Sequence, residues 1–261
     1  MDHRLWTTMK QIPNLFTLLN LVFGCIAIIL ILQPGETITA VDQGNLIINL
    51  PEKIMYASFF IFAAGLVDFL DGFLARLMKA SSEMGKQLDS LSDVVTFGVA
   101  PAMIMYQLLR MSYLKEESAL DTSVLLLLPA FLIACCAAWR LAKFNIDERQ
   151  TTSFRGVPTP ITGFVVAALP LVVWYNSWNL ASVVINHWVL YGITLLISYL
   201  MVSDIPIMSL KFKDYSLKGN QPKIILAVLA IILGVVFQWA AIPLIYLTYV
   251  ALSLLLRKQI S

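Results

Sequence analysis

The chain has 261 residues, of which 59% are hydrophobic and 13% are charged, and its mean hydropathy is +0.80. Ordinary soluble domains carry about 25% charged residues, so this composition excludes that class and indicates an integral membrane protein. The formal net charge of +2 says little by itself, and we expect no nucleic-acid partner.

A bilayer needs about 20 consecutive apolar residues for each helix that crosses it. The first such stretch begins at Ile12 and lacks an obvious small-residue cleavage site, so we interpret it as a retained helix rather than a signal peptide. No linker or low-complexity tract divides the chain, which predicts one all-α transmembrane bundle over residues 1–261. Eight spans are expected, at 12–32, 54–78, 88–110, 123–145, 158–177, 185–203, 222–237 and 240–256.

The positive charges are distributed unevenly over the loops between these spans. Placing the N terminus in the cytoplasm leaves only Lys53, Arg110 and Lys115 on the far side, out of 18 lysine and arginine residues. Positive residues gather on the cytoplasmic side of membrane proteins, so this asymmetry predicts that both termini are cytoplasmic.

Four aspartates stand at the facing ends of the second and third spans. Asp68 and Asp71 are three residues apart, and Asp89 and Asp93 are four apart, so each pair lies on one face of its helix. Because a short turn connects these antiparallel neighbours, we expect both pairs to converge at the cytoplasmic surface. Carboxylates that converge in a low-dielectric rim repel one another strongly unless cations neutralise them.

The residue types favour hard divalent ions. Carboxylate oxygens suit Mg²⁺, Mn²⁺ or Ca²⁺, whereas zinc would favour histidine or cysteine, and neither His3 nor His187 is near in sequence. Four acids are enough for a centre that holds two ions and leaves positions for a phosphate. Gly72 and Gly85 would let the backbone approach a ligand closely, and Arg76 supplies a planar cation suited to phosphate.

Two further roles are compatible with acids near the end of a span. Aspartates could cap helix ends at the membrane interface, which accounts for one aspartate more readily than for four at this spacing. A cation transporter would also hold carboxylates in its membrane part, but it predicts acids near the bilayer midplane and related halves of the chain. Here all four acids gather near one surface, and we find no internal repeat.

The spacing of the four aspartates and of the glycine, alanine and arginine residues near them resembles the signature of the CDP-alcohol phosphotransferase family at every fixed position. The resemblance implies a membrane enzyme that moves a phosphatidyl or similar group from a CDP-linked donor to an alcohol and releases CMP. It also implies a core of six helices and a centre of Mg²⁺ or Mn²⁺, up to two ions, held by all four aspartates, with Asp93 as the general base. The matching positions are Asp68, Asp71, Gly72, Ala75, Arg76, Gly85, Asp89 and Asp93.

Further stretches resemble the serine-transferring branch of this family, the phosphatidylserine synthases of bacteria and archaea. The likeness covers residues 10–211, which we interpret as the catalytic core, followed by two additional helices in 212–261. It implies CDP-diacylglycerol and L-serine as substrates, while inositol, inositol phosphate, glycerol phosphate or choline would suit the same chemistry. The stretches are IPNLFTLLNL (12–21), LDSLSDVVTFGVAPA (88–102), RLAKFN (140–145), FRGVPTP (154–160) and MVSDIPIMSLK (201–211).

The resemblance also implies a partner, and the size of the chain suggests a location. Members of the family often pair, so we expect a homodimer among membrane lipids. The compact chain favours a bacterial inner membrane, with the active site facing the cytoplasm.

Two groups of residues are expected to bind the substrates. The resemblance suggests nucleotide contact for Asn14 and Thr17, although such residues after Pro13 are also typical of a helix start. The complete set expected for CDP-diacylglycerol is Asn14, Thr17, Gly72, Ala75, Arg76 and Gly85.

The second group is basic and follows the fourth span. Arg140 and Arg155 would bind the donor diphosphate or the carboxylate of serine, with Lys143 and Asn145 beside them, although a basic cytoplasmic loop also attracts anionic lipid headgroups. Lys143 stands where the family pattern leads us to expect arginine, which keeps the charge but loses bidentate phosphate geometry.

Overall fold

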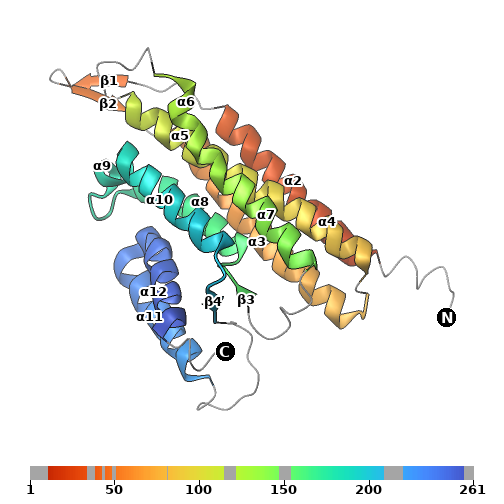
Figure 1. The fold of residues 1–261 in the computed structure, drawn as a ribbon. Helices are drawn as coiled ribbons and strands as arrows, with labels where there is room; N and C mark the ends of the chain where they lie inside the picture. The colour runs from red at the N-terminus through yellow and green to blue at the C-terminus, as the bar shows by residue number, and fades with distance from the viewer. Residues whose placement is uncertain are drawn as a thin grey trace.

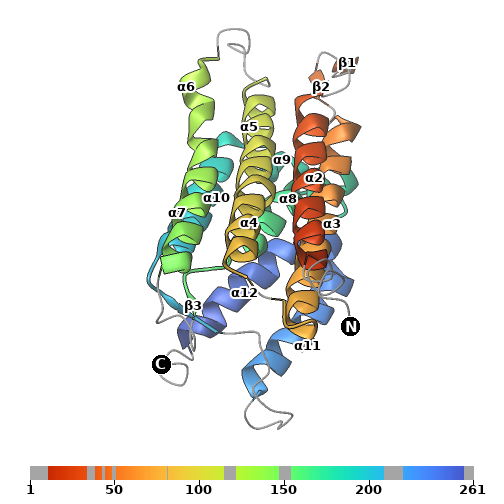
Figure 2. The ribbon, with the colours of Figure 1, turned by 90° about the vertical axis from the view of Figure 1, so that its right-hand side faces the viewer.

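The computed structural model describes residues 11–33, 39–42, 45–48, 51–80, 82–114, 122–146, 154–208 and 220–255. Within these residues the protein is a bundle of helices with two short two-stranded ladders (Figures 1 and 2). The predicted class, an all-α transmembrane bundle, is confirmed.

The first half of the bundle consists of long apolar helices. Pro13 occupies the first turn of α2, where its missing N–H is no loss. The Ser82 hydroxyl accepts a 3.0 Å hydrogen bond from the Gly85 N–H and so caps α4. These helices are α2 (Ile12–Leu32), α3 (Glu52–Leu77), α4 (Glu83–Asp93) continuing through the π-helical turn η1 (Val94–Val99) into α5 (Ala100–Tyr113), and α6 (Val124–Leu127) continuing through the 3₁₀ turn η3 (Leu128–Phe131) into α7 (Leu132–Ile146).

The second half contains shorter helices. Every predicted span is helical over most of its length, although α8 and α10 have only 17 and 16 residues. The predicted break between the last two spans is also present, because Gln238 has a φ of 51° and reverses the chain. The helices are α8 (Thr159–Tyr175), α9 (Ala181–Val184), α10 (His187–Val202), α11 (Gln221–Phe237), the 3₁₀ turn η4 (Gln238–Ala240) and α12 (Ala241–Leu255).

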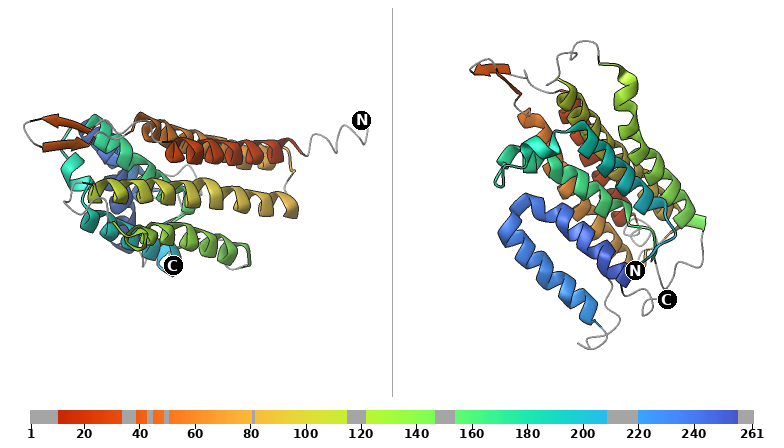
Figure 3. Two further views of the ribbon diagram at one scale, coloured as in Figure 1. Left: turned by 90° about the horizontal axis from the view of Figure 1, so that it is seen from above. Right: turned by 60° about the vertical axis from the view of Figure 1, so that its left-hand side comes forward.

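The packing places α8 inside the bundle and α11 outside it. α8 contacts α3, α5 and α12, and most of its side chains are buried. α11 and α12 form a hairpin beside α8 (Figures 1 and 3), and Leu226 is the single buried residue of α11. The outer face of α11 is therefore suited to contact lipid acyl chains.

Two ladders of extended chain were not predicted from the sequence. β1 (Thr39–Asp42) pairs with β2 (Asn45–Ile48), and β3 (Phe154–Arg155) pairs antiparallel with β4 (Pro206–Ile207). Gly156, directly after β3, has a φ of +71°, and a Cβ there would lie 2.4 Å from the Met201 carbonyl oxygen. Glycine is therefore required where the chain turns from β3 toward α8.

The start of α2, the end of α3 and the start of α4 lie at one end of the bundle, opposite the β1–β2 hairpin (Figure 2). α2 packs along α3 and also against α4 and η1. It approaches η1 closely at Gly24, where an added Cβ would lie 2.4 Å from the Thr96 Oγ1 and 3.0 Å from the Thr96 Cα. This close contact fixes the position of α2 relative to the helix that carries Asp89 and Asp93.

We expect Gly24→Ala to lower the free energy of unfolding by about 1–3 kcal/mol, because the added methyl group overlaps the Thr96 hydroxyl and crowds the Thr96 Cα. Gly192→Ala is the matched control, since an added Cβ at that position in α10 meets no atom within 4 Å. Thermal unfolding of the detergent-solubilised variants measures both effects. A melting temperature for Gly24→Ala at or above that of Gly192→Ala would contradict the close approach.

Candidate active site and metal centre

A pocket of about 560 Å³ opens between the start of α2, the end of α3 and the start of α4. Its lining includes Asp71, Asp89 and the basic side chains of Arg76 and Lys86. It also includes every residue that the sequence predicted for CDP-diacylglycerol, namely Asn14, Thr17, Gly72, Ala75, Arg76 and Gly85. Residues more than 50 positions apart in the chain therefore share one wall of this pocket.

Three of the four aspartates form a compact acidic group beside the pocket. Asp68, Asp71 and Asp89 each offer a carboxylate oxygen, and these oxygens all lie within 4.8 Å of one another. The Thr17 hydroxyl donates a 2.7 Å hydrogen bond to the Asp71 Oδ2, which fixes that carboxylate. An all-oxygen, triply anionic group of this size fits a hard divalent cation, which would also relieve the repulsion between the charges.

Asp93 lies one turn further along α4, outside this group of three. Its side chain is only 5% exposed and lies within electrostatic range of Asp68 and Asp89. The Asn20 Nδ2 donates a 3.4 Å hydrogen bond to the Asp93 Oδ1. The structure thus groups three carboxylates and leaves the buried Asp93 outside that group.

A row of polar contacts between α2 and the third span was not predicted from the sequence. The Ser92 hydroxyl donates to the Thr17 carbonyl oxygen at 3.0 Å, and the Thr96 hydroxyl donates to the Asn20 carbonyl oxygen at 3.2 Å. Thr17, Asn20 and Gly24 recur at helical spacing along one face of α2, and this periodicity was the signal that could have revealed the row.

A second group of basic residues comes from the end of α7 and from β3 and does not line the acidic pocket. Arg140, Lys143 and Arg155 line a small hollow with Ser203. Arg140 is 8% exposed, its Nη1 donates to the Thr159 hydroxyl at 3.1 Å, and its Nε has no hydrogen-bond partner within the described part of the chain. Arg140 is also close enough to Asp93 for their charges to interact.

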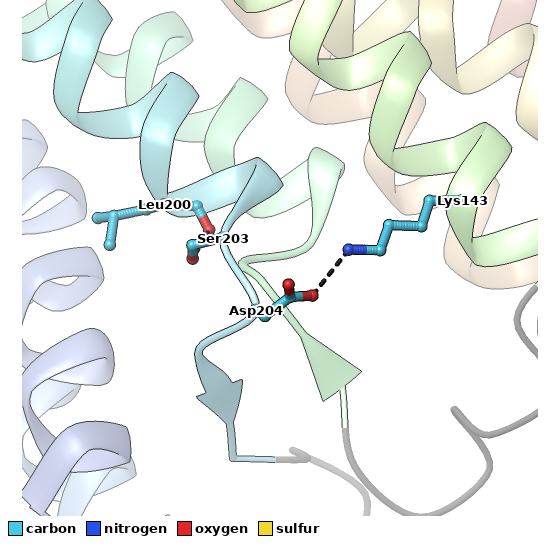
Figure 4. Close-up of polar contacts among 4 residues, drawn as sticks. All are labelled: Lys143, Leu200, Ser203 and Asp204. Atoms are coloured by element: carbon cyan, nitrogen blue, oxygen red, sulfur yellow. Dashed lines mark hydrogen bonds and ion pairs between the residues drawn. The ribbon is translucent and has the colours of Figure 1, made fainter.

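Lys143 and Asn145 are already engaged with other residues. The Lys143 ammonium forms a 2.7 Å ion pair with Asp204 (Figure 4), so its charge is partly neutralised within the protein. The Asn145 Nδ2 donates to the Ser90 hydroxyl at 2.9 Å, and Lys86 donates to the Asn145 carbonyl oxygen at 3.1 Å. Asn145 therefore joins α7 to α4 and does not line the hollow that contains Arg140.

These features define a class of protein: a helical membrane protein with an acidic group, of a composition that suits a divalent cation, beside a polar pocket. The family model of CDP-alcohol phosphatidyltransferase matches residues 10–202, and the chain belongs to this family.

Relatives from bacteria and archaea are similar over most of their length. The CDP-diacylglycerol–serine O-phosphatidyltransferase of Bacillus subtilis (strain 168) is 33% identical over 198 residues, which cover 76% of this chain and 89% of that protein. The archaetidylserine synthase of Methanothermobacter thermautotrophicus is 27% identical over 207 residues, 78% of this chain and 72% of that protein. The CDP-diacylglycerol–serine O-phosphatidyltransferase of Methanocaldococcus jannaschii is 32% identical over 161 residues, 62% of this chain and 68% of that protein.

We expect Asp71→Asn to weaken Mn²⁺ binding by more than about tenfold, because a neutral amide replaces one of three anionic ligands. Glu83→Gln is the matched control, since Glu83 lines the same pocket but does not belong to the group of three. Electron paramagnetic resonance titration of the purified protein with Mn²⁺ measures both. Equal affinity in the two variants would show that the acidic group is not the metal site.

Proposed function

We propose that this protein transfers a phosphatidyl group from CDP-diacylglycerol to L-serine, giving phosphatidylserine and CMP. The observation that carries this proposal is the acidic group of Asp68, Asp71 and Asp89 beside the pocket whose wall holds all the residues expected for the donor. The serine-transferring activity named for the bacterial and archaeal relatives supports the choice of acceptor.

Asp68, Asp71 and Asp89 would hold Mg²⁺ or Mn²⁺, up to two ions with Asp93 as a further ligand. Such ions draw charge from phosphoryl oxygens and from a departing phosphate, which is the chemistry that cleavage of a pyrophosphate needs.

The donor would lie in the pocket between α2, α3 and α4. A Cβ added at Gly72 would meet no atom within 4 Å, so this position leaves open space for a ligand beside Asp71. Gly85 is tighter, with the Asn14 Oδ1 only 3.0 Å from where its Cβ would stand. Arg76 and Lys86 line the same wall and would bind the anionic diphosphate through charge-assisted hydrogen bonds.

Asp93 would act as the general base. As a bond forms between the serine Oγ and the phosphatidyl phosphorus, the Asp93 carboxylate accepts the hydroxyl proton, and the bond from that phosphorus to the bridging oxygen of CMP breaks. The Asn20 amide holds the carboxylate in place through the hydrogen bond to its Oδ1.

The basic hollow would bind the carboxylate of serine. Arg140 is buried without an ion-pair partner among the described residues, and a buried guanidinium is stable only when an anion or other acceptors compensate for its lost hydration. Arg155 lines the same hollow and would share the anion. Lys143 contributes through its ion pair with Asp204 rather than as an open binding group.

The orientation and assembly belong to the same proposal. The excess of lysine and arginine on one side supports a cytoplasmic active site, where soluble CMP and serine are accessible. We propose a homodimer in a bacterial inner membrane, with the donor entering laterally from the lipid.

We expect Asp93→Asn to lower the turnover number by about 10²–10⁴-fold while CDP-diacylglycerol binding stays measurable, because the asparagine amide cannot accept the serine proton. Single-turnover assays and equilibrium binding of labelled donor separate the two quantities. Glu83→Gln, in the same pocket but outside the acidic group, should retain both. If the affinity of Asp93→Asn for the donor fell in proportion to its turnover number, Asp93 would be chiefly a metal ligand and not the general base.

A panel of acceptors tests the substrate directly. Purified protein with labelled CDP-diacylglycerol and Mn²⁺ should form phosphatidylserine from L-serine and release CMP, with little product from inositol, inositol phosphate, glycerol phosphate or choline. Arg140→Gln should raise the KM for serine more than the KM for the donor, because Arg140 lies outside the donor pocket. If another alcohol gave more product than serine, the proposal of serine as the acceptor would be wrong, while the proposed transfer of a phosphatidyl group would stand.

A further inference from the structure

Helix α12 lies beyond the part of the chain that matches the family model, yet it carries buried polar residues that face the core. Tyr249 and Ser253 are four residues apart, so they lie on one face of the helix. Their side chains are 4% and 0% exposed. Polar groups buried this deeply in a membrane-spanning helix need protein partners.

Both side chains bind the backbone of one residue, Met208. The Tyr249 hydroxyl donates a 2.7 Å hydrogen bond to the Met208 carbonyl oxygen. The Met208 N–H donates to the Ser253 Oγ at 3.2 Å, and that hydroxyl in turn donates to the Tyr249 carbonyl oxygen at 2.8 Å. Helix α12 therefore provides hydrogen-bond partners for both the N–H and the carbonyl oxygen of Met208, the residue directly after β4.

The held segment is joined by hydrogen bonds to residues that line the basic hollow. β4 pairs with β3, with Arg155 opposite Pro206, and the Gly156 N–H donates to the Ile205 carbonyl oxygen at 3.0 Å. Asp204, which shortly precedes β4, forms the ion pair with Lys143 of α7 (Figure 4). A shift of Met208 would therefore move the segments that carry Arg155 and Asp204.

Tyr249 is also linked to Arg140 itself. The Tyr249 hydroxyl and the Arg140 guanidinium lie close enough to interact electrostatically. The same tyrosine thus lies near Arg140 and also binds the backbone of Met208.

We propose that Tyr249 and Ser253 are positioning residues that hold the β3–β4 ladder, and with it Arg155, beside Arg140 in the geometry that binds the acceptor carboxylate. This role rests on the proposed function, in which the basic hollow binds serine. It assigns α12 a specific task in acceptor recognition. If α12 only filled space in the bundle, substitutions in it would change the KM values for both substrates equally.

Tyr249→Phe removes the hydroxyl and keeps the ring. We expect the KM for serine to rise about three- to tenfold, as for loss of one buried hydrogen bond, with the KM for CDP-diacylglycerol within about twofold of the original value. The matched control is Tyr246→Phe: Tyr246 is one turn earlier and 3% exposed, and its hydroxyl makes no hydrogen bond to β4 or Met208 in the described structure. Ser253→Ala should shift the KM for serine in the same direction as Tyr249→Phe.

Hydrogen exchange of the full-length variants provides a measurement that does not depend on activity. The amides of residues 154–158 and 205–208 should exchange faster in Tyr249→Phe than in Tyr246→Phe, while those of α4 stay unchanged. Unchanged exchange in these segments, or equal changes of the two KM values, would overturn the positioning role. If the original protein made no product from serine, the proposed function would fail, and the exchange experiment would still decide whether α12 holds the ladder.

Discussion

The mutual repulsion of Asp68, Asp71 and Asp89 is the constraint on which the arrangement of this end of the bundle depends. Their carboxylate oxygens lie within 4.8 Å of one another at the rim of an apolar bundle, where charges interact more strongly than in water. Such a group is stable only where a cation, hydrogen-bond donors and solvent access compensate for the repulsion. The Thr17 hydroxyl supplies one donor, and the adjoining polar pocket supplies the access.

The helix packing keeps the acidic group in place because α2 can approach the third span closely. Gly24 removes the side chain that would overlap Thr96, and the hydroxyls of Ser92 and Thr96 then reach the carbonyl oxygens of α2. Asp93 is followed directly by the π-helical turn η1, a feature that often marks functional positions because it rotates the residues on either side of it. The same contact therefore sets both the acidic group and the buried Asp93.

The sequence predicted what depends on local spacing and missed what depends on distant contacts. Pairs of acids at helical spacing, apolar stretches of bilayer length and a family pattern led to the bundle, the break between its last two spans and the carboxylates that lie together. The bond between Asn20 and Asp93 joins residues 73 positions apart, and no local pattern encodes it. The two-residue strands β3 and β4 are too short to show a period in sequence, and the engagement of Lys143 with Asp204 depends on where their segments meet.

The structure also shows why a boundary of sequence similarity need not be a boundary of the working unit. The family match ends at residue 202, whereas β4 and Met208 lie just beyond it and complete the ladder that begins at Phe154. Met208 is buried, so its backbone N–H and carbonyl groups need protein partners. Helix α12 provides them with Tyr249 and Ser253, while α11 presents apolar residues outward. The C-terminal hairpin is thereby joined to the segments around the basic hollow by backbone hydrogen bonds. Substitutions in the hairpin can therefore alter the geometry of the hollow while the acidic group keeps its arrangement.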